Sequence, residues 1–200
     1  MASAGIRDHI ANLNYSAIFT TRDVLKYGKR NAVDQCLHFL VKSGEIRRLA
    51  RGVFVQDPNI NPSIEQIAEI KAAAFGKRIY KYATNVLNQI ARFPQEDPNK
   101  GQYGKTFAIN GDSSGFETFR GPVKYKGIAQ RKAKLCESSI GEKVHALWHL
   151  GSDEHIEKAV RFVFRNLNRA ERANLRSCSS LMPAWLNDMF IDRFARILAS

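Results

Sequence analysis

The 200-residue sequence is poor in cysteine, and its three cysteines are far apart. Cys36, Cys136 and Cys178 are odd in number and irregularly spaced, which argues against a disulfide framework and for a reducing compartment. The sequence also lacks an apolar run long enough to cross a bilayer and the apolar core of a secretory signal. We therefore expect a cytoplasmic protein with no membrane partner.

Acidic residues are scarce relative to basic ones, with 19 Asp and Glu against 31 Lys and Arg and a net charge of +12. The excess is +4 in residues 1–59, +6 in residues 60–132 and +2 in residues 133–200, so it does not come from one basic tail. Such a surface suits a polyanion, although an acidic protein or a membrane surface would also fit. Charge alone therefore does not identify the partner.

Patterns typical of catalysis are absent or incomplete. Glu69 and Lys71 have the Glu-x-Lys spacing of some nucleases, but no Asp on a preceding strand completes the cluster. His145, His149 and His155 have a spacing that a metal site uses on a helix, but no acidic or cysteine ligand accompanies them at a fixed distance. No complete phosphate-binding loop or nucleophile elbow is present. We expect a protein that is not an enzyme and that uses no cofactor or metal.

Two short helices are predicted between residues 20 and 42. Thr20 is a suitable N-cap for the first, with Asp23 three residues later as its capping partner, and Gly28 ends it. From Asn31 onward the apolar residues recur at helical spacing, which places polar residues on the opposite, exposed side. An exposed polar face of this kind suits contacts to bases and phosphates.

A basic hairpin is predicted directly after the second helix. Gly44 ends that helix, and residues 46–49 and 53–55 form two short β segments around a tight turn. Helix, helix and hairpin in this order are typical of a winged helix-turn-helix, whose second helix enters the major groove while the wing contacts phosphates or the minor groove. The alternative is an ordinary small core with a solvated basic rim. The candidate DNA-binding residues are Arg30, Asn31, Gln35, His38, Lys42, Arg47, Arg48 and Arg51.

A domain boundary is predicted at residues 57–62, where two prolines and two asparagines interrupt the periodicity. The predicted domains are a winged helix over 1–59 and a mixed domain over 60–200, so the fold class is α/β in the α+β sense. The mixed domain should contain a small sheet followed by C-terminal helices. Its expected helices cover 64–76, 84–90, 144–150, 156–167 and 185–198, its strands 78–82, 105–110, 116–119, 123–125 and 128–132, and a turn lies around 168–179.

Aromatic residues alternate with Lys and Arg in the segments expected to form the sheet: Tyr80, Tyr82, Phe116, Phe119 and Tyr125. Aromatic side chains on a sheet can stack on unpaired bases, but on alternating strands they also pack inward as ordinary core. Core packing is the favoured interpretation. Exposed aromatics would instead favour an RNA-binding protein.

The hairpin sequence GEIRRLARGVFV of residues 44–55 resembles the wing of the AbiEi-type antitoxins of bacterial type IV toxin-antitoxin, or abortive-infection, systems. The wing of that family is usually written Gly-x-Ile-x-Arg-Leu-x-Arg-Gly-x-Tyr, and Phe54 stands where Tyr is common. Residues 103–106, 121–126 and 144–151 resemble later parts of the same family more loosely.

This resemblance implies an antitoxin-like protein that is not an enzyme. Its N-terminal winged helix would bind inverted repeats of double-stranded DNA in its own promoter, as a monomer or homodimer, and its C-terminal domain would protect against a nucleotidyltransferase toxin encoded nearby. A mobile-element nuclease with a DNA-targeting winged helix and an RNA-binding protein remain the alternatives.

Overall fold

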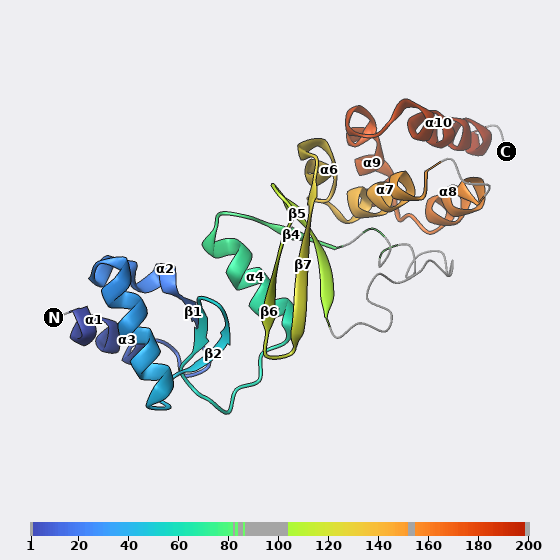
Figure 1. Ribbon diagram of the computed structural model, residues 1–200. Helices are drawn as coiled ribbons and strands as arrows, with labels where there is room; N and C mark the ends of the chain where they lie inside the picture. The colour runs from blue at the N-terminus through green and yellow to red at the C-terminus, as the bar shows by residue number, and fades with distance from the viewer. Residues whose placement is uncertain (1, 82, 84–85, 87–103, 152–154, 199–200) are drawn as a thin grey trace. The chain divides into compact units, whose positions relative to one another are not determined.

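The computed structural model describes residues 2–81, 83, 86, 104–151 and 155–198, with side chains assigned up to residue 192. Helices and strands are both present, so the predicted α+β fold class is confirmed (Figure 1). Contacts divide the chain into two compact units. The first unit comprises Met1–Ile79, Gln102–Lys105 and Ser114–Lys124, and the second comprises Tyr80–Gly101, Thr106–Ser113 and Tyr125–Ser200.

The predicted boundary after residue 59 lies inside the first unit. The division into functional domains over 1–59 and 60–200 stays a prediction. The elements of the first unit are α1 (Ala2–Ala11), β1 (Ile18–Thr20), α2 (Thr21–Val24), the 3-10 helix η1 (Leu25–Tyr27), α3 (Arg30–Lys42), β2 (Arg47–Ala50), β3 (Val53–Val55), α4 (Ile64–Ala74) and β6 (Ser114–Thr118).

The strands within the described residues form a seven-stranded sheet in the order β1-β3-β2-β6-β7-β5-β4. The remaining strands are β4 (Ile79–Tyr80), β5 (Lys105–Asn110) and β7 (Gly121–Ile128), each of which has residues in both units. Strand β3 pairs antiparallel with β1 on one side and with β2 on the other. Strand β2 also pairs antiparallel with β6, where Ala50 lies opposite Thr118.

The helix–helix–hairpin order predicted for residues 20–55 is confirmed, although its designation as a winged helix-turn-helix stays a prediction. Asp23 stabilises the start of α2, because its carboxylate accepts a hydrogen bond of 2.6 Å from the backbone N–H of Thr20. Gly44 follows α3 with a φ of +76°, a left-handed conformation that favours glycine. Gly52 has the same φ in the β2–β3 turn, and its carbonyl accepts a 3.0 Å hydrogen bond from the N–H of Thr21.

Two apolar clusters hold the first unit together. One lies between α1, α3 and the sheet and consists of Ile6, Ile10, Phe19, Val24, Val33, Leu37, Leu40, Ile46 and Phe54. The other contains Leu49, Ala50, Val53, Val55 and Ile67, with Phe116 of β6 packed against it. Helix α4 therefore contributes Ile67 to the core of the unit that contains the hairpin. Helix α1 and strand β1 were not predicted from the sequence.

The second unit is mainly helical in its C-terminal part. Its helices are α6 (Gln130–Leu135), α7 (Ser139–Leu150), α8 (Ile156–Arg165), α9 (Arg169–Ser177), the 3-10 helix η2 (Ser179–Leu181) and α10 (Ala184–Leu198). Its main core is formed by residues of α6 to α10, including Leu135, Val144, Leu147, Val160, Phe164, Leu175, Leu186 and Phe190. The helices predicted at 144–150, 156–167 and 185–198 are thus confirmed, with shifted ends.

Two predicted segments of the second unit are wrong. Residues 128–132 are not a strand, because β7 ends at Ile128 and α6 begins at Gln130. Residues 168–179 are not only a turn, because nine of them form α9. The short helix predicted at 84–90 and most of the polar loop after it lie outside the described residues, apart from Val86.

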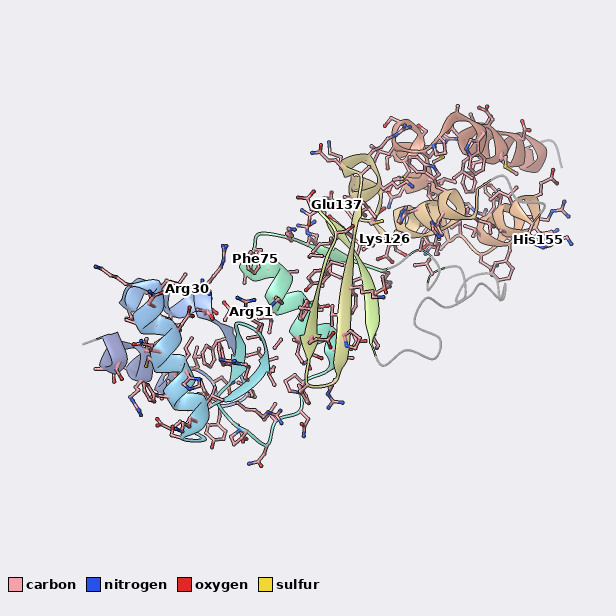
Figure 2. All side chains as sticks on the ribbon, in the orientation of Figure 1. Arg30, Arg51, Phe75, Lys126, Glu137 and His155 are labelled. Carbon is pink, nitrogen blue, oxygen red and sulfur yellow. The ribbon has the colours of Figure 1, made fainter. Side chains whose placement is uncertain are left out.

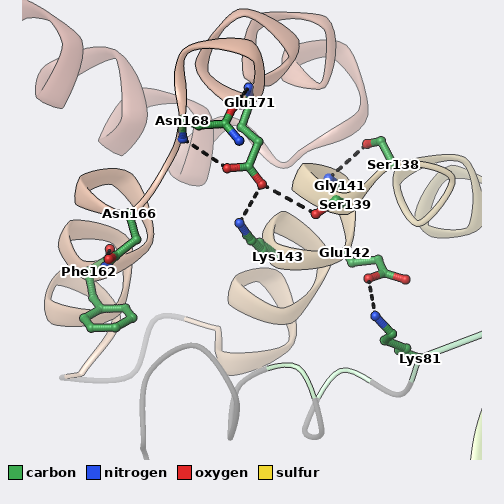
Figure 3. A network of polar contacts seen from close by, with 10 residues as sticks. All are labelled: Lys81, Ser138, Ser139, Gly141, Glu142, Lys143, Phe162, Asn166, Asn168 and Glu171. Carbon is green, nitrogen blue, oxygen red and sulfur yellow. Dashed lines mark hydrogen bonds and ion pairs between the residues drawn. The ribbon is translucent and has the colours of Figure 1, made fainter.

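Glu171 explains why the chain is helical after residue 168. Its backbone N–H donates to Oδ1 of Asn168 at 2.8 Å, and its carboxylate accepts from the backbone N–H of Asn168 at 3.1 Å, so the helix start is satisfied in both directions. The same carboxylate accepts a 2.7 Å hydrogen bond from Nζ of Lys143 on α7 (Figure 3). The network therefore caps α9 and fastens it to α7.

Candidate nucleic-acid interface

A basic hollow of about 360 Å³ lies in the first unit, between the start of α2, the first half of α3, the β2–β3 hairpin and the end of α4. Its charged lining comprises Arg22, Arg30, Arg48, Arg51 and Lys71 against a single carboxylate, Asp34. Figure 2 labels three of the lining residues: Arg30 of α3, Arg51 of the β2–β3 turn and Phe75, which follows α4. The hollow therefore concentrates positive charge from segments that are up to 50 residues apart in sequence.

Several of these cations are held in place by neighbouring side chains. Nε of Arg30 lies 2.8 Å from Oδ2 of Asp34, one helical turn later on α3. The guanidinium of Arg22 lies 4.3 Å from the ring centroid of Phe75, and that of Arg48 lies 5.6 Å from the ring of Phe54. The positive charges are thus oriented before any ligand arrives.

Lys71 of α4 links the hollow to the hairpin. Its Nζ donates a 2.6 Å hydrogen bond to the backbone carbonyl of Arg51 and lies 4.5 Å from the ring centroid of Phe116. Burial lowers the pKa of this lysine, and the positive charge of Arg51 lowers it further. The positive charges of Lys71 and Arg51 therefore repel each other, and an anion placed between them would relieve that repulsion.

Helix α3 lines the hollow with Arg30, Asp34 and Leu37 and has a separate exposed polar face. Val33, Leu37 and Leu40 are buried, whereas the predicted contact residues Asn31, Gln35, His38 and Lys42 are all exposed. These four positions repeat every three or four residues and therefore form one ridge along the helix. The prediction that these polar residues lie on the exposed side of α3 is confirmed.

Arg47 differs from the other two arginines of the hairpin. Its guanidinium donates to the backbone carbonyl of Ile60 and, at 3.2 Å, to the side chain of Asn61, and it lies 4.8 Å from the ring of Phe119. Successive side chains of a strand point to opposite faces, so Arg47 and Arg48 cannot both line the hollow. Arg48 and Arg51 line the hollow together with Arg30, whereas Arg47 contacts Ile60, Asn61 and Phe119 and is not part of its lining.

Sequence reasoning missed three residues of the hollow: Arg22, Lys71 and Phe75. The sequence pattern Glu69-x-Lys71 suggests only a nuclease, and Glu69 is an exposed helix residue outside the lining of the hollow. The sequence signal that could have found Lys71 is its position as a basic residue near the end of the apolar helix α4. Only the tertiary packing of α4 against the hairpin region brings it to the site.

Most aromatics of the sheet are core residues, as the favoured interpretation predicted. Tyr80 and Tyr125 are buried, and Phe116 packs against the second apolar cluster. Phe119 is the exception, being 44% exposed with the guanidiniums of Arg47 and Arg120 over its ring. Tyr82 lies outside the described residues.

Cys136 and His145 form a buried titratable pair in the second unit. Sγ of Cys136 lies 3.3 Å from Nδ1 of His145, and both side chains are buried. Burial raises the pKa of Cys136 to about 12 and lowers the pKa of His145 to about 4. Both groups are therefore neutral near pH 7 rather than a thiolate–imidazolium pair. Within the ranges that the structure describes, no three His, Cys, Asp or Glu side chains gather as a metal site would require.

Neither a family model nor a curated protein matches this chain. The AbiEi resemblance therefore stays a prediction that depends on the hairpin and the looser later segments. In the described part of the chain, no helix combines the length and apolar character needed to span a bilayer.

Proposed function

We propose that this protein is a DNA-binding transcriptional regulator that reads duplex DNA through α3 and the β2–β3 hairpin. The observation that carries the proposal is that α3 contributes Arg30 and Asp34 to the basic hollow, which also contains Arg48 and Arg51, while Gln35, the next residue of the same helix, is exposed. Cations attract and position the phosphates, while a polar helix face supplies hydrogen bonds to base edges in the major groove. One surface thus has both parts of a sequence reader.

The resemblance of the hairpin to the AbiEi wing supports a more specific role. We infer an antitoxin-like regulator that acts in the cytoplasm, binds inverted repeats in its own promoter and pairs with a nucleotidyltransferase toxin. In this role the chain is not an enzyme. The inference would be contradicted if co-expression with the toxin encoded by the neighbouring gene gave no protection.

The DNA-binding proposal is tested with the full-length protein. Duplexes selected from a random library serve as the specific probe, and a scrambled duplex serves as the non-specific one. Replacing Arg48 and Arg51 together by Ala should weaken binding to both probes. It should also reduce the slope of log affinity against log salt by about 2, because the loss of two phosphate contacts means that fewer counterions are released on binding. Fluorescence anisotropy at several salt concentrations measures both quantities.

A matched control removes the same charge elsewhere. Arg161 and Arg165 are exposed on α8 in the second unit, and their double Ala variant should retain the salt slope. Gln35→Ala should relax sequence preference by about 1–3 kcal/mol while leaving scrambled-duplex binding almost unchanged. An equal fall in affinity for the two duplexes would show that α3 is not the reader. No binding to any duplex at low salt would overturn the proposal.

A further inference from the structure

The basic hollow contains an exposed aromatic side chain. Binding to the backbone of a duplex does not require such a side chain. Phe75 directly follows α4, lines the hollow and is 57% exposed. We propose that the hollow binds one unpaired nucleotide, whose base stacks on Phe75 while its phosphate is held by Arg48 and Arg51. This inference rests on the proposed DNA-binding function and names the part of the nucleic acid that this site takes.

The size of the hollow suits one nucleotide. Its volume of about 360 Å³ lies at the lower end of the roughly 300–1,000 Å³ range of small-molecule pockets. A base inside a duplex is covered on both faces by its neighbours, so it cannot stack on a protein ring unless it leaves the helix. A base at a strand end, in a bulge or in a single strand meets this condition.

Phe75 is built as a stacking platform. The guanidinium of Arg22 lies 4.3 Å from its ring centroid, which fixes the ring from one side and leaves more than half of the side chain exposed. Aromatic rings and guanidinium planes are the surfaces on which proteins stack unpaired bases. Stacking of this kind accepts every base, so the site should show little preference among the four.

The charge beside the platform is suited to a phosphate. Oδ2 of Asp34 forms an ion pair with Nε of Arg30 at 2.8 Å. None of the ion pairs formed between described residues includes Arg48 or Arg51. The lining therefore holds more cations than its single carboxylate neutralises. A phosphate at this point would accept charge-assisted hydrogen bonds from both guanidiniums.

The test uses the full-length protein and three probes: a blunt duplex, the same duplex with one extrahelical adenine, and adenosine monophosphate as a competitor. The bulged duplex should bind about tenfold more tightly than the blunt one, the factor expected from one base on an aromatic ring. Phe75→Ala should abolish this preference without changing affinity for the blunt duplex, and Phe75→Trp should retain it. Phe162, which is 47% exposed on α8, gives the matched control Phe162→Ala, which should behave as the wild type.

The outcomes separate this inference from the function on which it rests. Blunt-duplex binding with no gain from the bulge, and no competition by adenosine monophosphate beyond that of inorganic phosphate, would overturn the inference and leave DNA binding intact. Competition by the mononucleotide without a bulge preference would support the site and assign it to free nucleotides. Mononucleotide binding without any duplex binding would support the site and overturn the DNA-binding proposal. Because the wild-type comparison needs no variant, it decides the question even if Phe75→Ala fails to fold.

Discussion

At the scale of single residues, adjacent arginines of one strand have different roles. Arg48 lines the basic hollow, whereas Arg47 donates to Ile60 and Asn61 and packs on Phe119. The difference follows from the alternation of side chains along a strand. Sequence reasoning identified all the arginines of the hairpin but grouped them, because composition shows charge and not the direction in which a side chain points.

This difference predicts opposite effects of two substitutions. Arg47→Ala should lower the free energy of unfolding by about 1 kcal/mol, because the hydrogen bonds to Ile60 and Asn61 are lost, and should leave the salt dependence of DNA binding nearly unchanged. Arg51→Ala should reduce the salt slope by about 1 with little effect on stability, because its side chain is exposed and the carbonyl that accepts from Lys71 is retained. Urea unfolding and anisotropy titrations measure the two effects. A salt slope lowered equally by both variants would place Arg47 at the DNA.

His145 predicts how stability depends on pH. Burial lowers its pKa from 6.5 to about 4, with smaller contributions from Lys132 and His149. Between these values the unfolded chain binds a proton that the folded chain does not, so stability is full above pH 6.5 and falls as pH decreases toward 4. The loss should approach about 3 kcal/mol, at roughly 1.4 kcal/mol per pH unit.

Chemical unfolding of the full-length protein at a series of pH values measures this loss. His145→Gln removes the titrating group and should flatten the curve between pH 6.5 and 4, whatever its effect on absolute stability. His38→Gln, at an exposed position on α3, is the control and should leave the curve as steep as in the wild type. An unchanged slope in His145→Gln would mean that other groups cause the acid sensitivity.

At the scale of elements, sequence patterns predicted best where local signals agree. The hairpin has Gly44 and Gly52 at left-handed positions, and α3 has one continuous apolar face, so both were found from sequence. Helix α9 was not predicted because its residues are mostly polar and only Leu175 is buried, so it shows no apolar periodicity. Its sequence does contain the capping-box spacing of Asn168 and Glu171. The hollow could not be predicted as a whole, because α4 reaches it only through tertiary packing.

Glu171 gives a prediction for the element that was missed. It joins the start of α9 to Lys143 of α7, and its pKa is lowered chiefly by the hydrogen bond from Lys143 and then by that from the backbone of Asn168 (Figure 3). Glu171→Gln keeps the size of the side chain but removes the charge, and should lower the free energy of unfolding at pH 7 by about 1–3 kcal/mol. Denaturant unfolding measures the change.

The control for this variant is Glu157→Gln, an exposed carboxylate in the first turn of α8, which should change stability by less than about 1 kcal/mol. Because the lowered pKa of Glu171 belongs to the folded state, its contribution is present above the ordinary value of 4.5 and is lost as pH falls below it. The wild type and Glu171→Gln should therefore become equally stable in acid, where the carboxylate of Glu171 is protonated. A persistent difference there would indicate a packing effect instead.

At the scale of the whole molecule, positive charge is distributed over both parts of the chain. Residues 1–79 have 12 Lys and Arg against 7 Asp and Glu, and residues 80–200 have 19 against 12, so they carry +5 and +7. The candidate interface nevertheless lies in the first unit, because it depends on how charges are gathered rather than on their number. Net charge predicts a polyanionic partner, but it does not identify the candidate surface.

The composition of the first unit predicts which N-terminal fragment is stable. A fragment ending at residue 59 follows the predicted domain boundary but lacks α4, and with it Ile67 of the second apolar cluster and Lys71 of the hollow. Loss of a fully buried isoleucine costs about 2–5 kcal/mol, which is most of the stability available to a domain of this size. Fragment 1–79 keeps Ile67 and Lys71 but lacks Phe116 of β6, which packs on the same cluster. It should therefore be more stable than fragment 1–59 and bind duplex DNA, whereas fragment 1–59 should be largely unfolded at 25 °C. Circular dichroism melts and anisotropy test this directly, and an equal melting temperature for the two fragments would show that α4 is not part of the folding unit.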